Sequence, residues 1–358
     1  MAARLQFLDR IFCGALLKSR HMPERVFITG IGGFVGSHVA KSAAAAGLSV
    51  RGSVRNGSHD ASLSSIIPGV ELRVLDLNTS SEDEFTSAMQ GCDYLAHVAS
   101  PFPGGSVTSE EMKAAIEGTA KVLKAAKAAG IKKVVLTSSV AAISGNWPKD
   151  SKRGTSQAEA FNGGDWTKLE GLESTYAESK TRAERAAWDL SKAIGVQLST
   201  VHPSFVQGPM LLPRAPTSTA LVKRILEGSM PAVPPIGMNV CSVTDVADTH
   251  VAALLGGEAS VGQRYLVTSG NVLMTDLAKK VKFAYSTWPV KTLEAPWILM
   301  KLYSCFDAQA ATVMSSWRKE TYYDSAPTAA LLSRELADPY DACLEMAKSL
   351  VDQGIATK

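Results

Sequence analysis

Residues 25–40 read RVFITGIGGFVGSHVA, and the order of residue types in this segment predicts its structure. Its first five residues form a short apolar run typical of a buried parallel strand, and a helical pattern begins at Phe34. The turn between them places glycine at 30, 33 and 36, which allows a tight bend, close approach of a pyrophosphate and close packing of helix on strand. A strand, a glycine turn and a helix in this order predict a dinucleotide-binding βαβ unit. The residues expected to contact the cofactor here are Gly30, Gly33, Phe34, Val35 and Gly36.

Strands and helices continue to alternate down the chain. Further strands are predicted over 48–54, 70–75, 94–98, 133–137 and 196–202, and helices over 109–129 and 176–193. This alternation predicts an α/β fold, a Rossmann-type doubly wound parallel sheet with helices on both faces. After Gly208 prolines become frequent and the pattern loosens. We therefore expect an N-terminal extension (1–24), a mainly dinucleotide-binding domain (25–207) and a smaller C-terminal substrate-binding lobe (208–358) with segments that return to the main sheet.

Composition excludes several classes of protein. The net charge of +3 arises from mixed signs without a basic block, so no nucleic-acid partner is expected. The five cysteines are far apart and form no CxxC pair, which argues against a disulfide framework or a metal site and favours a reducing compartment. No transmembrane segment is predicted. A cytoplasmic location is expected, or a mitochondrial one if residues 1–22, with four basic residues and one acid, are a transit peptide and not an extra helix or a junction.

The end of the second predicted strand bears on the choice between NAD and NADP. NAD requires an acid there for the ribose 2′-hydroxyl, but the segment from Arg51 to Arg55 has none, and the next acid is Asp60. A guanidinium suits a 2′-phosphate, so NADP(H) is the expected cofactor, with Arg55 and Arg51 as contacts unless both are solvated strand-end charges. Asp76 and Leu77 follow the third strand and either contact the adenine or form a surface turn.

A second motif points to proton transfer. Tyr176 and Lys180 are four residues apart, so they share one face of the predicted helix. A neighbouring ammonium favours the phenolate, which makes the phenol a better proton donor to a carbonyl oxygen. Ser139, at the carboxyl end of a strand, is the preferred hydrogen-bond donor to the substrate oxygen, with Ser138 and Thr137 as alternatives. His97 and His202, also at strand ends, are expected to pack or to contact the cofactor loop.

These blocks resemble the extended short-chain dehydrogenase/reductase family, in its dihydroflavonol-4-reductase-like branch, which includes cinnamoyl-CoA reductases. The segments TGIGGFVGSHV, HVASPF, VVLTSSVAA, YAESKTRAERAAW and VHPSFVQGP are similar to successive blocks of that branch. The resemblance implies Ser139, Tyr176 and Lys180 as catalytic residues and Arg55 as the 2′-phosphate contact. It also implies cofactor contacts from Val98, Ala99, Pro203 and Ser204. Ala115 stands where many members have an asparagine that supports a proton relay.

The expected function is NADP-dependent reduction of a ketone or aldehyde, a small-molecule carbonyl substrate, by a monomer or homodimer. A 3β-hydroxysteroid dehydrogenase, a nucleotide-sugar epimerase or dehydratase, and a non-catalytic NADP-binding redox sensor remain alternatives. The region after Gly270 is rich in aromatic residues, which either line a substrate pocket, form lobe core or meet a partner. Those residues are Phe283, Tyr285, Trp288, Trp297, Tyr303, Phe306 and Trp317.

Overall fold

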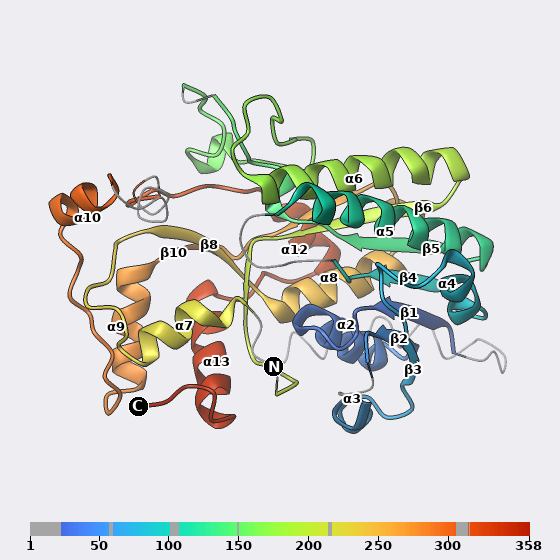
Figure 1. Ribbon diagram of the computed structural model, residues 1–358, viewed down its shortest axis with the longest axis horizontal. Helices are drawn as coiled ribbons and strands as arrows, with labels where there is room; N and C mark the ends of the chain where they lie inside the picture. The colour runs from blue at the N-terminus through green and yellow to red at the C-terminus, as the bar shows by residue number, and fades with distance from the viewer. Residues whose placement is uncertain are drawn as a thin grey trace.

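The main sheet of this protein contains seven parallel strands in the order β3-β2-β1-β4-β5-β6-β9 (Figure 1). The computed structural model describes residues 23–56, 60–100, 107–148, 150–213, 217–305, 314 and 316–358. The strands are β1 Arg25–Thr29, β2 Ser49–Val54, β3 Glu71–Val74, β4 Tyr94–His97, β5 Lys133–Thr137, β6 Gln197–Pro203 and β9 Arg264–Val267. The order reverses between β1 and β4, which is where such sheets bind ligands beyond the carboxyl ends of their strands.

Helices cover both faces of the sheet because its strands are apolar on both sides. In β1, Val26 and Ile28 belong to one buried cluster, together with α2 (Phe34–Ala45) and α8 (Val243–Leu255). Phe27 belongs to a different cluster with α4 (Glu82–Met89) and α5 (Ser109–Ala128). The helix α6 (Thr175–Ile194) lies beside α5 on this second face (Figure 1). The predicted doubly wound sheet is confirmed.

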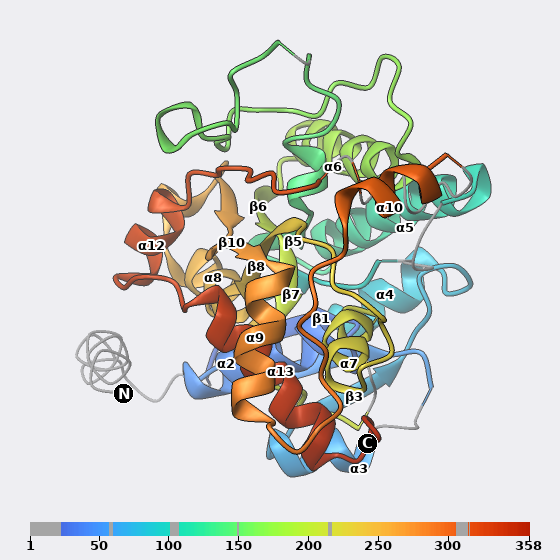
Figure 2. The same ribbon diagram turned by 90° about the vertical axis from the view of Figure 1, so that its left-hand side faces the viewer.

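A second, smaller sheet organises the lobe. Its order is β10-β8-β7, with β8 antiparallel to β10 and parallel to β7. Figure 2 shows α7, α9 and α13 in front of this sheet, and they share one apolar core with it. The bounds are β7 Phe205–Gln207, β8 Gly237–Ser242, β10 Gly270–Leu273, α7 Thr219–Leu226, α9 Met274–Ala284 and α13 Pro339–Asp352.

The C-terminal half also supplies parts of the main layers. The strand β9 pairs with β6, while α8 and α12 (Ala326–Leu332) pack against one another and against β9. The remaining α-helices of the described chain are α3 Asp60–Ile66 and α10 Trp297–Tyr303. None of the described helices has the length and apolar character needed to span a bilayer. Residues 1–22 of the predicted extension lie outside the described residues.

Candidate active site

A cavity of about 800 Å³ lies at the carboxyl ends of β1 to β4. Its walls come from the glycine turn, the end of β2, the segment after β3 and the segment after β4. The predicted cofactor contacts in this lining are Gly30, Gly33, Phe34, Val35, Gly36, Arg55, Asp76, Leu77, Val98 and Ala99. Residues that are far apart in the sequence, but that are predicted to bind the same ligand, therefore line one cavity.

The glycine turn leaves no room for a side chain at Gly30 or Gly36. Gly30 has φ +68°, and a Cβ there would lie 3.1 Å from Ala99. A Cβ on Gly36 would lie 2.1 Å from the carbonyl oxygen of Gly30, well inside van der Waals contact. The N-terminus of α2 therefore approaches β1 and β4 closely, with its first backbone amides at the cavity wall. This arrangement fits the diphosphate of a dinucleotide, whose charge is stabilised by helix N-terminal amides.

Thr29, which sequence reasoning missed, holds the opposite wall in place. Its Oγ1 accepts hydrogen bonds from the backbone amides of Val98 and Ala99, both at 3.0 Å. The same hydroxyl lies 2.7 Å from Nδ1 of His97. Since both lone pairs are used, the hydroxyl donates its proton to that nitrogen. His97 thus serves the cofactor loop through Thr29, in agreement with the packing role expected for it.

The two arginines predicted to contact the cofactor lie in different places. Arg55 is exposed and lines the cavity. Arg51 corrects the prediction: its guanidinium is buried and forms an ion pair with Glu71 at 2.8 Å. It also donates to the carbonyl oxygens of Ala88 and Gln90. Strand alternation does not account for the difference, since residues 51 and 55 would share one face of an extended strand. Instead, β2 ends at Val54, so Arg55 lies beyond the strand, while Arg51 lies within it and contacts the end of α4.

The segment after β3 is held by hydrogen bonds of its own. Asp76 accepts from the backbone amide of Asn78 at 2.7 Å, so its carboxylate shapes the turn. Lys121, on α5, donates to the carbonyl oxygens of Leu77 and Ser80 at 2.8 and 2.6 Å. Both predicted residues, Asp76 and Leu77, line the cavity, and Lys121 fixes the loop that carries them.

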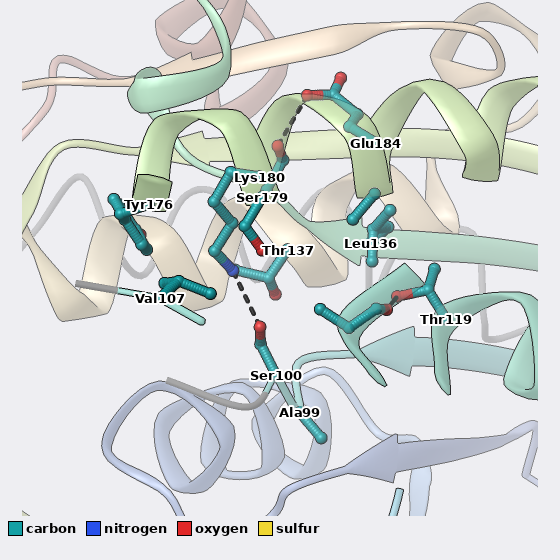
Figure 3. A pocket seen from close by; sticks show the side chains of 13 residues that line it. Ala99, Ser100, Val107, Thr119, Leu136, Thr137, Tyr176, Ser179, Lys180 and Glu184 are labelled. Carbon is teal, nitrogen blue, oxygen red and sulfur yellow. Dashed lines mark hydrogen bonds between the residues drawn. The ribbon is translucent and has the colours of Figure 1, made fainter. Parts of the chain in front are cut away.

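A second cavity of about 500 Å³ adjoins the first, since Gly33, Phe34 and Arg55 line both. The predicted catalytic residues line its other side, on α6 and after β5: Ser139, Tyr176 and Lys180. Pro203 and Ser204, at the end of β6, also line it. Figure 3 shows Tyr176 and Lys180 side by side on α6, with the Lys180 ammonium 3.1 Å from Oγ of Ser100. The ammonium is 6.0 Å from the centroid of the Tyr176 ring.

Hydrogen bonding separates the three candidate hydroxyls after β5. Nδ1 of His250 contacts a carbonyl oxygen, so this nitrogen carries the ring proton and donates. Nε2 of the same ring therefore accepts a hydrogen bond from the hydroxyl of Thr137, 2.7 Å away. Ser138 donates to Glu184 at 2.7 Å. Ser139 only accepts, from the amide of Ala141, among its hydrogen bonds in the described chain. Its hydroxyl proton can therefore be donated into the cavity, which favours Ser139 over its neighbours.

Beneath these residues lies a buried ionic cluster that sequence reasoning missed. Glu184, on α6, contacts Arg264 of β9 at 2.8 Å and His202 of β6 at 2.9 Å. Burial favours the protonated carboxyl, but His202 and Arg264 overcome this and hold the pKa of Glu184 well below its ordinary value. The position of Glu184, four residues beyond Lys180, was visible in the sequence, whereas its partners were not.

Among the aromatic side chains predicted for the lobe, those that the structure describes do not line these cavities. Tyr285 and Trp288 pack together in the lobe core, while Phe283 and Trp297 are 91% and 52% exposed. Phe306 and the side chain of Tyr303 lie outside the described residues. Within the described chain no three His, Cys, Asp or Glu side chains form a group able to hold a metal ion.

Comparisons with known proteins agree with this geometry. The model of the NAD dependent epimerase/dehydratase family matches residues 26–267. The tetraketide alpha-pyrone reductase 1 of Arabidopsis thaliana is 30% identical over 92% of this chain and 96% of that protein. A cinnamoyl-CoA reductase of Medicago truncatula is 30% identical over 70% of this chain and 78% of its own. Gre2 of Candida albicans, solved in complex with NADPH, superposes with a TM-score of 0.74 at 26% identity, covering 92% of this chain and 99% of that one. The family resemblance stated from the sequence is confirmed.

Proposed function

We propose that this chain, which belongs to the NAD-dependent epimerase/dehydratase family and is an oxidoreductase of the extended short-chain type, uses NADPH to reduce a ketone or aldehyde. The observation that carries the proposal is the junction of the two cavities. The glycine turn lines both, and Ser139, Tyr176 and Lys180 lie together on the far wall of the second. A carbonyl compound in the second cavity would thus lie between a bound nicotinamide and a phenol.

The cofactor assignment rests on the first cavity. Its glycine turn and the amides of α2 suit a diphosphate, and Arg55 suits a 2′-phosphate through charge-assisted bonds. The absence of an acid between Arg51 and Arg55 removes the usual partner of a free 2′-hydroxyl. The NADPH bound to the Candida albicans relative is consistent with this preference. When bound, the cofactor supplies the hydride.

The chain supplies the proton and stabilises the developing charge. Tyr176 holds the proton at Oη and donates it to the carbonyl oxygen as the carbonyl carbon becomes tetrahedral. Ser139 donates a hydrogen bond to the same oxygen before the proton arrives. The Lys180 ammonium stabilises the resulting phenolate until it regains a proton from solvent, and its bond to Ser100 keeps it near the cofactor side of the cavity.

The second cavity also indicates the class of substrate. Its wall beyond the catalytic residues is mostly apolar: Phe205, Val206, Met210, Leu211 and Leu212 line it, together with the polar Thr217 and Ser218. Arg55 and Lys180 are the cationic side chains among its described lining residues, and both face the cofactor side. This lining favours an uncharged carbonyl compound over a nucleotide sugar, whose diphosphate would need further cations. The intact Ser139, Tyr176 and Lys180 argue against a non-catalytic sensor.

The test is NADPH oxidation measured across a carbonyl panel of flavanonols, cinnamoyl thioesters, methylglyoxal and ketosteroids, with nucleotide sugars as the comparison class. Turnover of at least one carbonyl compound is expected. Tyr176→Phe should abolish that turnover and leave the dissociation constant of NADPH nearly unchanged. Retained turnover in this variant would remove Tyr176 as the acid. Conversion of a nucleotide sugar with tightly retained cofactor would favour an epimerase instead.

A further inference from the structure

We propose that Glu184 is a positioning residue for this active site: it holds the catalytic helix against three strands and balances a buried guanidinium behind Lys180. This inference rests on the proposed reductase activity. Tyr176, Lys180 and Glu184 follow one another at intervals of four residues, so they lie on one face of α6. Tyr176 and Lys180 face the cavity, while the Glu184 side chain, 1% exposed, is buried between α6 and the sheet.

The carboxylate of Glu184 joins α6 to three strands. Its Oε2 accepts from the hydroxyl of Ser138 at the end of β5, at 2.7 Å. Its Oε1 accepts from Nε of Arg264 on β9 at 2.8 Å. On β6, Nε2 of His202 lies 2.9 Å from both carboxylate oxygens. Because Ser138 immediately precedes Ser139, one side chain connects the helix that carries the acid to the strand that carries the oxygen donor.

Charge balance makes this connection specific to a carboxylate. The side chain of Arg264 is 8% exposed, and its Nη1 also donates to the carbonyl oxygens of Gly163 and Asp165. A buried guanidinium needs a fixed anion nearby, and a neutral amide at 184 would direct an NH₂ group toward the donors of Arg264 and His202. Removing the carboxylate charge would therefore leave Arg264 as an unbalanced cation below the site.

Glu184 and the catalytic pair line the same small cavity. Lys180 and Glu184 line one small cavity of about 20 Å³ together with Ser138 and Ser179 (Figure 3). The charged or titratable groups that face the carboxylate are Arg264 from β9 and His202 from β6. The neutral donors are the hydroxyls of Ser138 and Thr200 and the indole nitrogen of Trp188. With little solvent between them, interactions in such a region are screened less than at the surface.

Two consequences distinguish this role from simple stabilisation of the fold. First, loss of the Ser138 link should misplace the hydroxyl of Ser139 and lower kcat more than it changes KM, because positional errors act on the chemical step. Second, loss of the negative charge should favour the phenolate of Tyr176. The high-pH limb of the reduction rate, where the acid loses its proton, should then move to lower pH.

The experiment compares Ser138→Ala with Ser199→Ala, on the carbonyl substrate found for the wild type. Both substitutions remove a buried hydroxyl that donates one hydrogen bond, but Ser199 donates to the carbonyl oxygen of Ser260 and does not touch Glu184. Ser138→Ala should lower kcat about 10-fold with KM for NADPH nearly constant. Ser199→Ala should keep kcat within about twofold, whatever it does to stability. Equal losses of kcat in the two variants would overturn the proposal.

Glu184→Gln tests the charge. Glu184 lies eight helical residues after Tyr176, which corresponds to about 12 Å along the helix axis. At this distance, loss of one charge should move the high-pH limb of the reduction rate to lower pH by about 0.3 to 1 pH unit. If the high-pH limb stays at the same pH while the rate falls at every pH, the role of Glu184 is merely structural. If Glu184→Gln does not fold, the comparison of Ser138→Ala with Ser199→Ala still tests the proposal. The proposed function fails separately, if Tyr176→Phe retains the turnover of the wild type.

Discussion

Gly36→Ala is the substitution whose effect the structure specifies most sharply. An alanine Cβ at this position would lie 2.1 Å from the carbonyl oxygen of Gly30 and 2.8 Å from its carbonyl carbon. Both atoms belong to the backbone, so no side chain can rotate away. The turn must open by about 1 Å to reach an ordinary contact, and overpacking of this kind costs about 1–3 kcal/mol or more.

An opposing gain must be subtracted. Alanine is favoured over glycine inside a helix by about 1 kcal/mol, and Gly36 lies in the first turn of α2. We therefore expect a net loss of about 0–2 kcal/mol or more in the free energy of unfolding. Because the displaced carbonyl also accepts the amide of Gly33 at 2.9 Å, the affinity for NADPH should fall at least about 10-fold.

The matched control is Gly118→Ala, on α5. There the added Cβ would meet Leu77 at 3.6 Å, an ordinary contact, so stability should stay the same or rise by up to about 1 kcal/mol. Urea unfolding of the cofactor-free protein and fluorescence titration with NADPH measure both quantities. A Gly36→Ala variant that matches Gly118→Ala in stability and in cofactor affinity would refute the geometry of the turn.

Three further predictions address the cofactor, the oxygen donor and the buried histidines. Arg55→Ala should weaken the binding of NADPH far more than the binding of NADH in parallel titrations. Equal losses of affinity would contradict the assignment of Arg55 to the 2′-phosphate. Ser139→Ala should lower kcat by about 10²–10³ with NADPH affinity unchanged, measured in the same assay as the wild type; a loss below about threefold would contradict its role. Burial and the nearby Lys180 ammonium lower the pKa of His97 to about 3. Burial lowers the pKa of His250 to about 4. Since the unfolded chain then binds more protons below about pH 6.5, the unfolding free energy should fall on acidification from there toward pH 4. His250→Gln should reduce that slope by up to about 1.4 kcal/mol per pH unit, and an unchanged slope in urea titrations would contradict this.

Much of the fold was predictable because local pattern and tertiary contact agree in a parallel sheet. The predicted strands 133–137 and 25–29 coincide with β5 and β1, and the predicted helix over 176–193 differs from α6 by one residue at each end. Gly30, Gly33 and Gly36 are required by backbone geometry alone, so their spacing in the sequence was sufficient to locate the turn. Tyr176 and Lys180 lie one helical turn apart, and that too is a local relation.

Other features depend on contacts between distant segments. Arg51 and Arg55 are both predicted from the sequence as cofactor contacts, but one pairs with Glu71 and the other lines the cavity, because only the packed sheet distinguishes a buried strand position from a strand end. The choice among Thr137, Ser138 and Ser139 followed from partners on α8 and α6. Hydrophobic period and glycine spacing are properties of neighbouring residues, so the amino-acid order was enough for the sheet and the cofactor turn. The ion pair of Glu184 with Arg264 joins residues 80 positions apart, and such a pair exists only once α6 has packed against the sheet.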